Sequence, residues 1–353
     1  MTIIPSSTED LTPEWFTSIL GLKENNEVKA VKLQPLGESD SVSGHIYRVK
    51  LTYRKRIRGA PKSVVLKLPQ PRHLRTNWLL DAYKNEVMFY QTLAHKVGIP
   101  VPKHIYSDID TETCDYVLVI EDFPDSTNVR DDTGATPEQA YKLLENMARL
   151  HAGNWANSEL ESKLVGFNNS IDLLCAGLTR MPVFLSRFSQ YIQPEEMEIF
   201  LAMPDGFRAA VEPLLDAPKT IVHNDYSMKN ILILTHCGEP SYVLVDWANL
   251  RWGPGARDLN FFIMTSVPPQ IRPIGECAFL RHYWATLVGM GVSGYSFEQL
   301  LGDYRRCVIM DMARMVNFGG GEYFSPMYES ITKHLIRGRT GSAKTLGLGS
   351  LFM

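Results

Sequence analysis

The sequence predicts an α+β protein of two lobes: a smaller lobe of mostly antiparallel strands with one main helix, and a larger, mostly helical lobe. Short apolar runs typical of strands are concentrated in the first third of the chain, whereas helical spacing of apolar residues dominates after Thr136. The acidic, proline-containing segment 121–125 between these regions is typical of a hinge. We therefore expect an N-terminal lobe over residues 1–124 and a C-terminal lobe over residues 125–337.

The composition is that of an ordinary globular protein. Of the 353 residues, 44% are hydrophobic and 21% are charged, and the net charge of −3 favours neither nucleic acid nor an acidic membrane as a partner. We find no signal peptide and no apolar run of the ~20 residues that span a bilayer. The five cysteines form no C-x-x-C pair, so neither zinc nor a disulfide framework is indicated, and we expect a cytoplasmic protein. The oligomeric state stays open, and a monomer is compatible with the sequence.

The N-terminal lobe is predicted to begin with a short helix over residues 8–20, followed by strands over residues 28–36 and 45–53. The loop between these strands is rich in small residues, among them Gly37, Ser39, Ser41 and Ser43. A loop of this kind can fold over the phosphates of a nucleotide and offer its backbone amides to them. The same composition is also typical of a plain hairpin turn, and the loop by itself does not decide between the two interpretations.

A third apolar strand, residues 63–69, contains a single charged residue, Lys67. A buried ammonium without a partner is costly, so Lys67 needs a carboxylate, and the helix predicted over residues 78–94 offers Glu86. A strand lysine paired with a helix glutamate is the arrangement that holds lysine on the α- and β-phosphates of ATP. The alternative is that Lys67 only extends its charged end to solvent from a strand edge.

Two further strands, residues 101–108 and 116–120, complete the predicted sheet. After the hinge, a capping threonine followed by proline and an acidic residue starts a helix at Thr136. His151 lies on the apolar face of this helix, and we interpret it as a core histidine. Further helices are predicted over residues 194–215, 258–265, 274–290, 297–317 and 323–336, followed by a flexible tail over residues 338–353.

The residues suited to chemistry lie between positions 221 and 262. One apolar run ends shortly before Asp225, and Asn230 follows. A second run, residues 242–245, ends in Asp246. We expect the two short strands to bring these three side chains to one end of a hairpin-like unit. Two carboxylates and an amide in this order suit Mg²⁺-dependent phosphoryl transfer, because one aspartate can accept a hydroxyl proton while the other two groups hold the metal ion.

The pattern His-x-Asp-x-x-x-x-Asn from His223 to Asn230, followed by a strand and Asp246, resembles the catalytic core of the protein-kinase-like superfamily. It resembles most closely the aminoglycoside phosphotransferase and choline kinase branch. The run 257–266 is similar to a segment of the ecdysteroid-kinase-like families, in which Phe-Gln usually follows the metal-binding aspartate. Here Trp247-Ala248 stands in that place. The His-Arg-Asp, Asp-Phe-Gly and Ala-Pro-Glu signatures of protein kinases are missing from the sequence.

The resemblance implies that ATP binds to the N-terminal lobe and the hinge. Lys67, paired with Glu86, would hold the phosphates together with the glycine- and serine-containing loop. The backbone near Glu121 and Phe123 would form hydrogen bonds with the adenine edge.

For the chemistry, the resemblance implies that Asp225 takes the acceptor proton and that Asn230 and Asp246 bind Mg²⁺. Lys229 could neutralise charge on the transferred phosphate. We expect His223 to be a hydrogen-bonding brace and Asp258 to cap a helix or brace the catalytic loop.

The predicted activity is transfer of the γ-phosphoryl group of ATP to a hydroxyl group of a small molecule. The aromatic and methionine content of residues 181–203 favours an apolar, sterol-like alcohol over a polycationic aminoglycoside, which would need an acidic pocket. Aminoglycoside, choline and sugar kinases remain alternatives, as does a nucleotide-binding protein without turnover. By resemblance, the candidate pocket residues are Asp172, Met181, Phe184 and Phe188, for each of which ordinary packing is an equal alternative.

Overall fold

The structure is a computed structural model of the whole chain. It describes residues 4–23, 25–36, 44–55, 57–127, 134–236, 238–321, 329–330, 332–333, 335–336 and 346–352. The chain forms two compact units. The first unit contains residues 1–127 and 232–250, and the second contains residues 128–231 and 251–353. The predicted hinge lies close to residue 127, where the chain first passes from one unit to the other. The segment 232–250 belongs to the first unit, whereas the predicted boundaries placed it in the C-terminal lobe.

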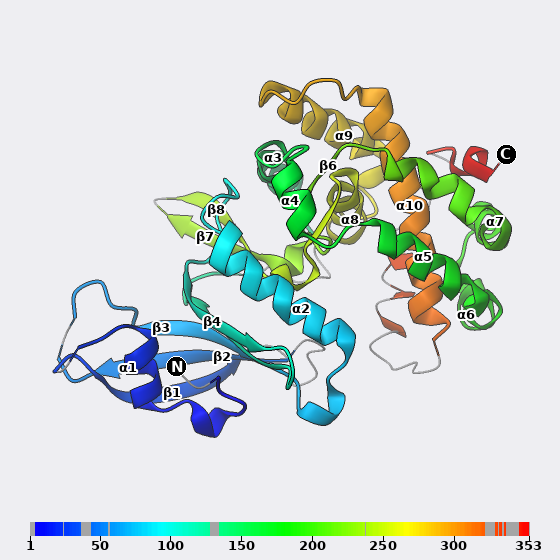
Figure 1. The fold of residues 1–353 in the computed structure, drawn as a ribbon. Coiled ribbons are helices and arrows are strands. Elements are labelled where there is room, and N and C mark those ends of the chain that lie inside the picture. Colours follow the sequence, from blue (N-terminus) through cyan, green and yellow to red (C-terminus); the bar gives the residue numbers. More distant parts are fainter. Residues whose placement is uncertain are drawn as a thin grey trace. The chain divides into compact units, whose positions relative to one another are not determined.

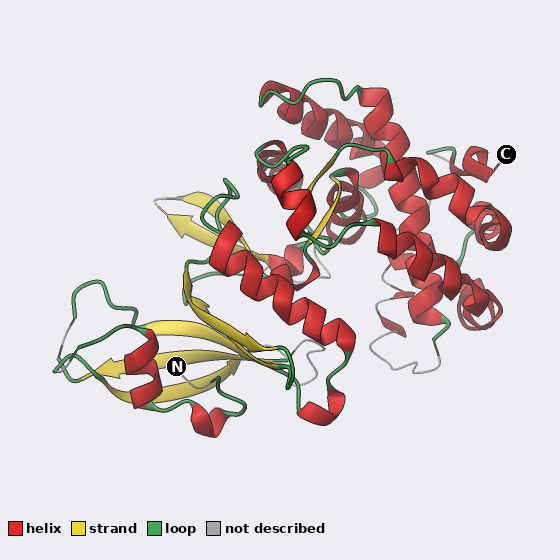
Figure 2. Cartoon of the chain, viewed as in Figure 1, coloured by secondary structure: helices red, strands yellow, loops and turns green. Residues whose placement is uncertain are grey.

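The first unit is built on a five-stranded antiparallel sheet with strand order β1-β2-β3-β5-β4 (Figures 1 and 2). The N-terminal sheet and the C-terminal helices confirm the predicted α+β class. Two of the strands have the bounds that the apolar alternation predicts. The strands are β1 (Val28–Leu36), β2 (His45–Tyr53), β3 (Ser63–Leu68), β4 (His104–Asp110) and β5 (Asp115–Glu121).

Helix α1 (Pro13–Ile19) covers part of this sheet and closes its hydrophobic core. Thr12 caps the helix by accepting a hydrogen bond from the Trp15 N–H at 3.2 Å, and Pro13 occupies the first turn, where its missing N–H costs nothing. Trp15 and Phe16 are buried in one cluster with side chains of β2, β3 and β5, including Val49 and Val119. Burial of these side chains holds the sheet rigid beneath Lys67.

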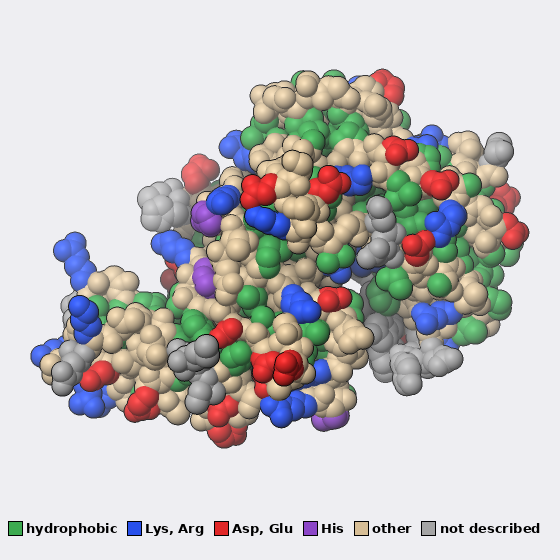
Figure 3. All heavy atoms as spheres, viewed as in Figure 1, with side chains coloured by type: hydrophobic (Ala, Val, Ile, Leu, Met, Phe, Trp, Pro, Cys, Tyr) green, Lys and Arg blue, Asp and Glu red, His purple; other side chains and the backbone are tan. Residues whose placement is uncertain are grey.

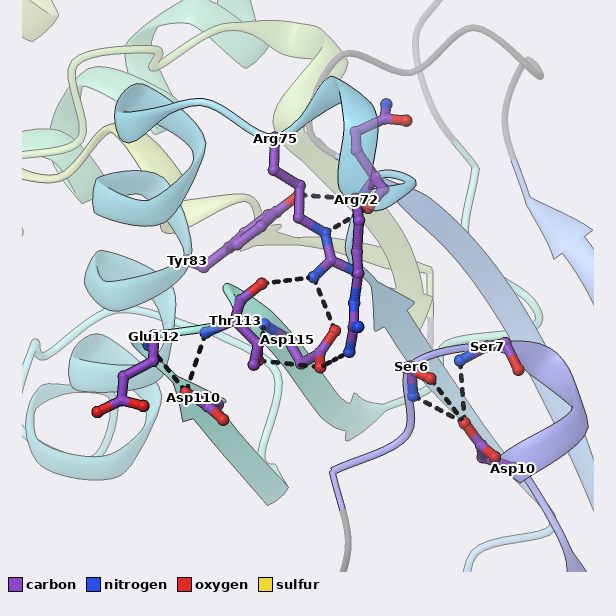
Figure 4. A network of polar contacts seen from close by, with 11 residues as sticks. Ser6, Ser7, Asp10, Arg72, Arg75, Tyr83, Asp110, Glu112, Thr113 and Asp115 are labelled. Carbon is purple, nitrogen blue, oxygen red and sulfur yellow. Dashed lines mark hydrogen bonds and ion pairs between the residues drawn. The ribbon is translucent and has the colours of Figure 1, made fainter.

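Helix α2 (Asn77–Met88) lies against β4 and β5 and continues as a short π-helix, Phe89–Leu93 (Figure 1). Two arginines before the helix fasten it to the sheet (Figure 4): Arg75 Nη1 and Arg72 Nη2 donate to the two oxygens of Asp115 at 2.7 and 2.8 Å. The Arg75 Nε also donates to the Gln70 carbonyl at 2.7 Å, and the Tyr83 hydroxyl accepts from the Gln70 N–H at 3.0 Å. These bonds fix where α2 presents Glu86.

The hairpin of β7 (Ile231–His236) and β8 (Glu239–Leu244) is packed with the first unit. The Leu244 N–H donates to the Pro100 carbonyl at 3.0 Å, and Thr127 exchanges two backbone hydrogen bonds with Ile233. The strand before the loop 223–230, β6 (Lys219–Val222), instead pairs with β9 (Arg251–Pro254) in the second unit. The expectation that the two strands form one hairpin-like unit is therefore wrong, because apolar runs indicate strands but not which strands pair.

The second unit is mostly helical (Figure 2). Its helices are α3 (Pro137–Ala152), α4 (Ser158–Lys163), α5 (Asn168–Gly177), α6 (Met181–Phe188), α7 (Pro194–Val211), α8 (Ala256–Ser266), α9 (Arg272–Gly289) and α10 (Phe297–Gly319). The segment 155–193, which shows no regular pattern in the sequence, thus contains three short helices. In the tail, residues 348–352 form a short 3₁₀ helix that packs against α7, with Leu348 buried.

Acidic and basic side chains are interspersed on the face of each unit that Figure 3 shows. Within the described residues, no helix combines the length and the apolar composition needed to cross a membrane.

Candidate active site

In the first unit, Lys67 on β3 is the centre of an ion-pair cluster. Its ammonium lies 2.7 Å from Glu86 Oε1 and 3.0 Å from Asp246 Oδ1. The predicted pairing with Glu86 is thus present, whereas no local sequence pattern indicates the contact with Asp246. The exposed fractions of the Lys67 and Glu86 side chains are 12% and 3%, whereas that of Asp246 is 33%. Asp246 is therefore the member of the cluster that a ligand in solvent can reach.

The charges of this cluster depend on one another. Burial alone would lower the pKa of Lys67, but the carboxylates of Asp246 and Glu86 outweigh burial and raise that pKa above its usual value. Lys67 therefore stays protonated at neutral pH. Burial raises the pKa of Glu86, against the opposing effect of the Lys67 ammonium. The Tyr116 hydroxyl donates to Glu86 Oε2 at 2.8 Å, so both oxygens of the Glu86 carboxyl group are held.

Helix α2 also fixes the backbone around Asp246. Asn85 Nδ2 donates to the Ala248 carbonyl at 2.8 Å, and the Trp247 and Phe89 rings stack with centroids 3.8 Å apart. Trp247 is fully buried. Asp246 itself has φ +66°, a left-handed conformation that aspartate tolerates better than most residues. Trp247-Ala248, which differs from the Phe-Gln of the related families, thus has a packing role here.

The hinge segment follows β5. The Asp122 carboxylate accepts hydrogen bonds from Arg48 Nε at 2.9 Å and Ser63 Oγ at 2.5 Å, which ties the hinge to the sheet. The Glu121 N–H donates to the Lys103 carbonyl at 2.9 Å, and the Phe123 carbonyl accepts from Ser126. Within the described part of the chain, the Phe123 N–H has no hydrogen-bond acceptor. It is therefore available to a ligand.

In the second unit, the loop 223–230 brings Asp225, Lys229 and Asn230 together. Asn230 Nδ2 donates to the Asp225 carbonyl at 2.9 Å and to Asp225 Oδ2 at 3.1 Å. The Lys229 ammonium lies 3.1 Å from the same Oδ2. Asp225 is partly accessible, with 15% of its side chain exposed, whereas half of the Lys229 side chain is exposed. This arrangement orients the Asp225 carboxylate and leaves it within reach of solvent.

Helix α8 holds the start of this loop through Asp258, which is fully buried. Its two carboxylate oxygens accept hydrogen bonds from the His223 N–H and the Asn224 N–H, both at 2.7 Å. His151 Nε2 lies 3.3 Å from the same carboxylate, and His151 Nδ1 lies 2.7 Å from the Tyr283 hydroxyl. Asp258 therefore braces the loop, which was one of its two predicted roles, and His151 is a buried, hydrogen-bonded core residue as predicted.

We expect Asp258→Ala to destabilise the protein by about 3 kcal/mol, because it leaves one buried and one partly buried backbone N–H group without acceptors. Urea unfolding followed by circular dichroism measures this loss. Asp258→Asn is the matched control, since the amide oxygen preserves one of the two acceptors and should recover roughly half of the loss. Equal stability of wild type and Asp258→Ala would contradict the bracing role.

A buried network that sequence reasoning missed supports the residue before Asp225. Asn224 has φ +62°, and its side-chain oxygen accepts a hydrogen bond from Arg257 Nε at 3.0 Å. Arg257 Nη1 in turn lies 2.6 Å from Asp311 on α10, and both charged side chains are at most 3% exposed. No local sequence signal connects Arg257 with Asp311, because 54 residues separate them.

The remaining predicted site residues divide into those outside the described residues and those that the structure places elsewhere. Gly37, Ser39, Ser41 and Ser43 lie outside the described residues. Three of the candidate pocket residues, Met181, Phe184 and Phe188, are buried in the core of the second unit, where Phe184 also packs on Phe200. Asp172 is exposed and pairs with Arg208. Burial of the three apolar residues favours ordinary packing, the alternative weighed for them.

The donor groups present suit Mg²⁺ bound to a nucleotide. Among the described residues, no three His, Cys, Asp or Glu side chains gather as a metal cage. Mg²⁺ in nucleotide sites usually takes only one or two protein oxygens and completes its shell with phosphates and water. Asp246 offers an accessible carboxylate. Within the described residues, both side-chain hydrogen bonds of Asn230 use its Nδ2, which leaves its Oδ1 as an oxygen ligand.

Comparison with solved structures shows that the fold is that of small-molecule kinases. The GDP complex of a mutant aminoglycoside 2'-phosphotransferase-IIIa matches with a TM-score of 0.59 and 12% identity, over 94% of this chain and 98% of that chain. Choline kinase from Cryptosporidium parvum matches with a TM-score of 0.56 and 11% identity, over 97% of both chains. Ethanolamine kinase from Plasmodium vivax matches with a TM-score of 0.57 and 14% identity, over 88% of this chain and 80% of that chain.

Sequence comparison places the protein more narrowly. The model of the ecdysteroid kinase-like family matches residues 38–291, which is more than half of the chain. The chain belongs to this family, and the predicted resemblance is confirmed. Among curated proteins, no sequence matches the chain significantly.

Proposed function

We propose that the protein is an ATP- and Mg²⁺-dependent phosphotransferase that moves the γ-phosphoryl group of ATP to a hydroxyl group of a small molecule. The observation that carries the proposal is the contact of Lys67 with both Glu86 and Asp246. A buried, protonated lysine beside an accessible carboxylate gives one site with a phosphate-binding cation and a metal-binding anion. Membership of a kinase-like family and the fold of small-molecule kinases support the same conclusion.

The first unit would bind the nucleotide. The Lys67 ammonium would hold the α- and β-phosphates, with Glu86 keeping it in place. The free Phe123 N–H would donate to the adenine edge, next to Glu121 at the end of β5. Mg²⁺, held by Asp246 and Asn230, would neutralise charge on the phosphates.

The second unit would bind the acceptor. Asp225 would accept the proton of the acceptor hydroxyl, and its hydrogen bond from Asn230 and ion pair with Lys229 would fix the direction of the carboxylate. The proton would leave the acceptor hydroxyl late, in a loose transition state. Once Asp225 has accepted the proton, its carboxyl group is neutral, and Lys229 would be free to turn toward the transferred phosphate.

Transfer of label from [γ-³²P]ATP tests this function. The protein is incubated with Mg²⁺ and with panels of sterols, amino alcohols, aminoglycosides and sugars, alongside a generic protein substrate. We expect label in a small hydroxylated compound and none in protein. Label in protein would favour a protein kinase. Tight Mg-ATP binding without transfer to any fraction of a metabolite extract would favour a nucleotide-binding protein without turnover.

A further inference from the structure

Two arginines of the second unit share one carboxylate. Asp311 on α10 is only 2% exposed, and one of its oxygens lies 2.6 Å from Arg257 Nη1 and 3.4 Å from Arg314 Nη1. Its other oxygen accepts from Asn260 Nδ2 at 2.5 Å. Arg257 and Asn260 therefore form the short contacts, and Arg314 keeps only a long, weak one.

The positive charge of the Arg314 guanidinium is thus poorly balanced by the Asp311 carboxylate. A guanidinium carries five N–H donors, and the contact with Asp311 is the only hydrogen bond of Arg314 within the described residues. Burial lowers the pKa of Arg314, and the positive charge of Arg257 lowers it further, whereas Asp311 and Asp225 act in the opposite direction. About a quarter of the side chain is exposed, so the donors can be reached from solvent. An added anion would stabilise this charge.

Arg314 is connected to the catalytic loop. Asp311 joins Arg314 to Arg257, which donates to the side chain of Asn224, the neighbour of Asp225. The Arg314 guanidinium carbon also lies 5.6 Å from the centre of the Phe261 ring and 6.0 Å from that of Phe318, and Phe318 is exposed. The surface at this end of α10 therefore combines a cation with the exposed ring of Phe318.

We propose that Arg314 binds the acceptor, and that the acceptor carries an anionic group together with an apolar or aromatic part that contacts Phe318. This inference rests on the proposed kinase function and narrows its acceptor class. A carboxylate or phosphate would take the unused N–H donors of Arg314 in a two-pronged contact. A polycationic acceptor would be repelled by the same guanidinium, so the site disfavours aminoglycosides.

Three small phenols of equal size but different charge test the proposal: 4-hydroxyphenylacetate (anionic), tyrosol (neutral) and tyramine (cationic). Their binding to the full chain is measured by ligand-observed NMR. We expect wild type to bind the anion about tenfold more tightly than tyrosol, a difference of about 1.4 kcal/mol, and tyramine most weakly. R314Q should remove the preference for the anion, and R314K should restore part of it.

R281Q is the matched control. Arg281 on α9 also stacks on an aromatic ring, 4.3 Å from the centre of Phe297, but has no contact with Asp311 among the described residues. R281Q should bind the three phenols as wild type does. F318A should weaken the binding of all three phenols by a similar factor and preserve the order of their affinities, because it removes an apolar contact without changing the charge of the site.

The proposal is overturned if wild type binds no anion, if the three phenols bind equally, or if the preference survives in R314Q. Mg-ATP affinity is measured by calorimetry on the same samples. Normal Mg-ATP binding without an anion preference would remove only the acceptor inference, whereas absent Mg-ATP binding would remove the proposed kinase function.

Discussion

Asp225→Ala is expected to lower the rate of phosphoryl transfer by about 10²- to 10⁴-fold, the range that loss of a positioned general base produces. Mg-ATP affinity should stay within about threefold of wild type, since Asp225 is assigned to the acceptor rather than to the nucleotide. Single-turnover transfer from [γ-³²P]ATP gives the rate, and calorimetry gives the affinity. Near-normal turnover would remove Asp225 from the mechanism.

Asp172→Ala is the matched control for this change. Asp172 is another carboxylate of the second unit that pairs with a basic side chain, Arg208, but 69% of its side chain is exposed. An exposed ion pair of this kind contributes little to stability, so its loss should leave both turnover and folding unchanged. A similar loss of turnover in both variants would indicate a general effect of charge rather than proton transfer.

Asp246→Ala is expected to weaken Mg-ATP binding by at least about tenfold, which corresponds to about 1.4 kcal/mol. The loss of affinity should depend on the metal. In calorimetric titrations, the ATP affinity of wild type should differ strongly between Mg²⁺ and EDTA, and that of the variant should differ little. The physical reason is that Asp246 supplies the accessible carboxylate of the Lys67 cluster.

Asp81→Ala, an exposed aspartate on α2 of the same unit, controls for the loss of one negative charge. It should bind Mg-ATP as wild type does. Unchanged Mg-ATP affinity in Asp246→Ala would refute the ligand role. Unchanged affinity for metal-free ATP in the same variant is expected, because Lys67 retains its contact with Glu86.

Strand bounds and the need of a buried charge for a partner could be predicted from the sequence. The alternation of apolar residues gave β1 and β2 their correct bounds, because one face of each strand packs on the core. The cost of a buried ammonium predicted the pairing of Lys67 with Glu86, which the structure contains. For Asp258 the sequence predicted either a helix cap or a brace of the loop, and its bonds to the His223 and Asn224 N–H groups show the brace.

Features set by contacts between distant residues could not be predicted. Lys67 and Asp246 are 179 residues apart, and no periodicity links them. The pairing of β6 with β9 instead of a hairpin partner has the same cause. For Phe184 and Phe188 the sequence left core packing and a pocket wall as alternatives, because both positions require the same apolar side chains. Their burial favours core packing.

The stacking of Trp247 on Phe89 gives the protein a natural optical reporter. The indole is shielded from water and lies next to Asp246 in the chain, so its fluorescence should respond when a metal–nucleotide complex forms there. The chain has six tryptophans, and subtracting the emission of a Trp247→Phe variant isolates this one. Binding could then be followed in real time without a label and before the acceptor is known.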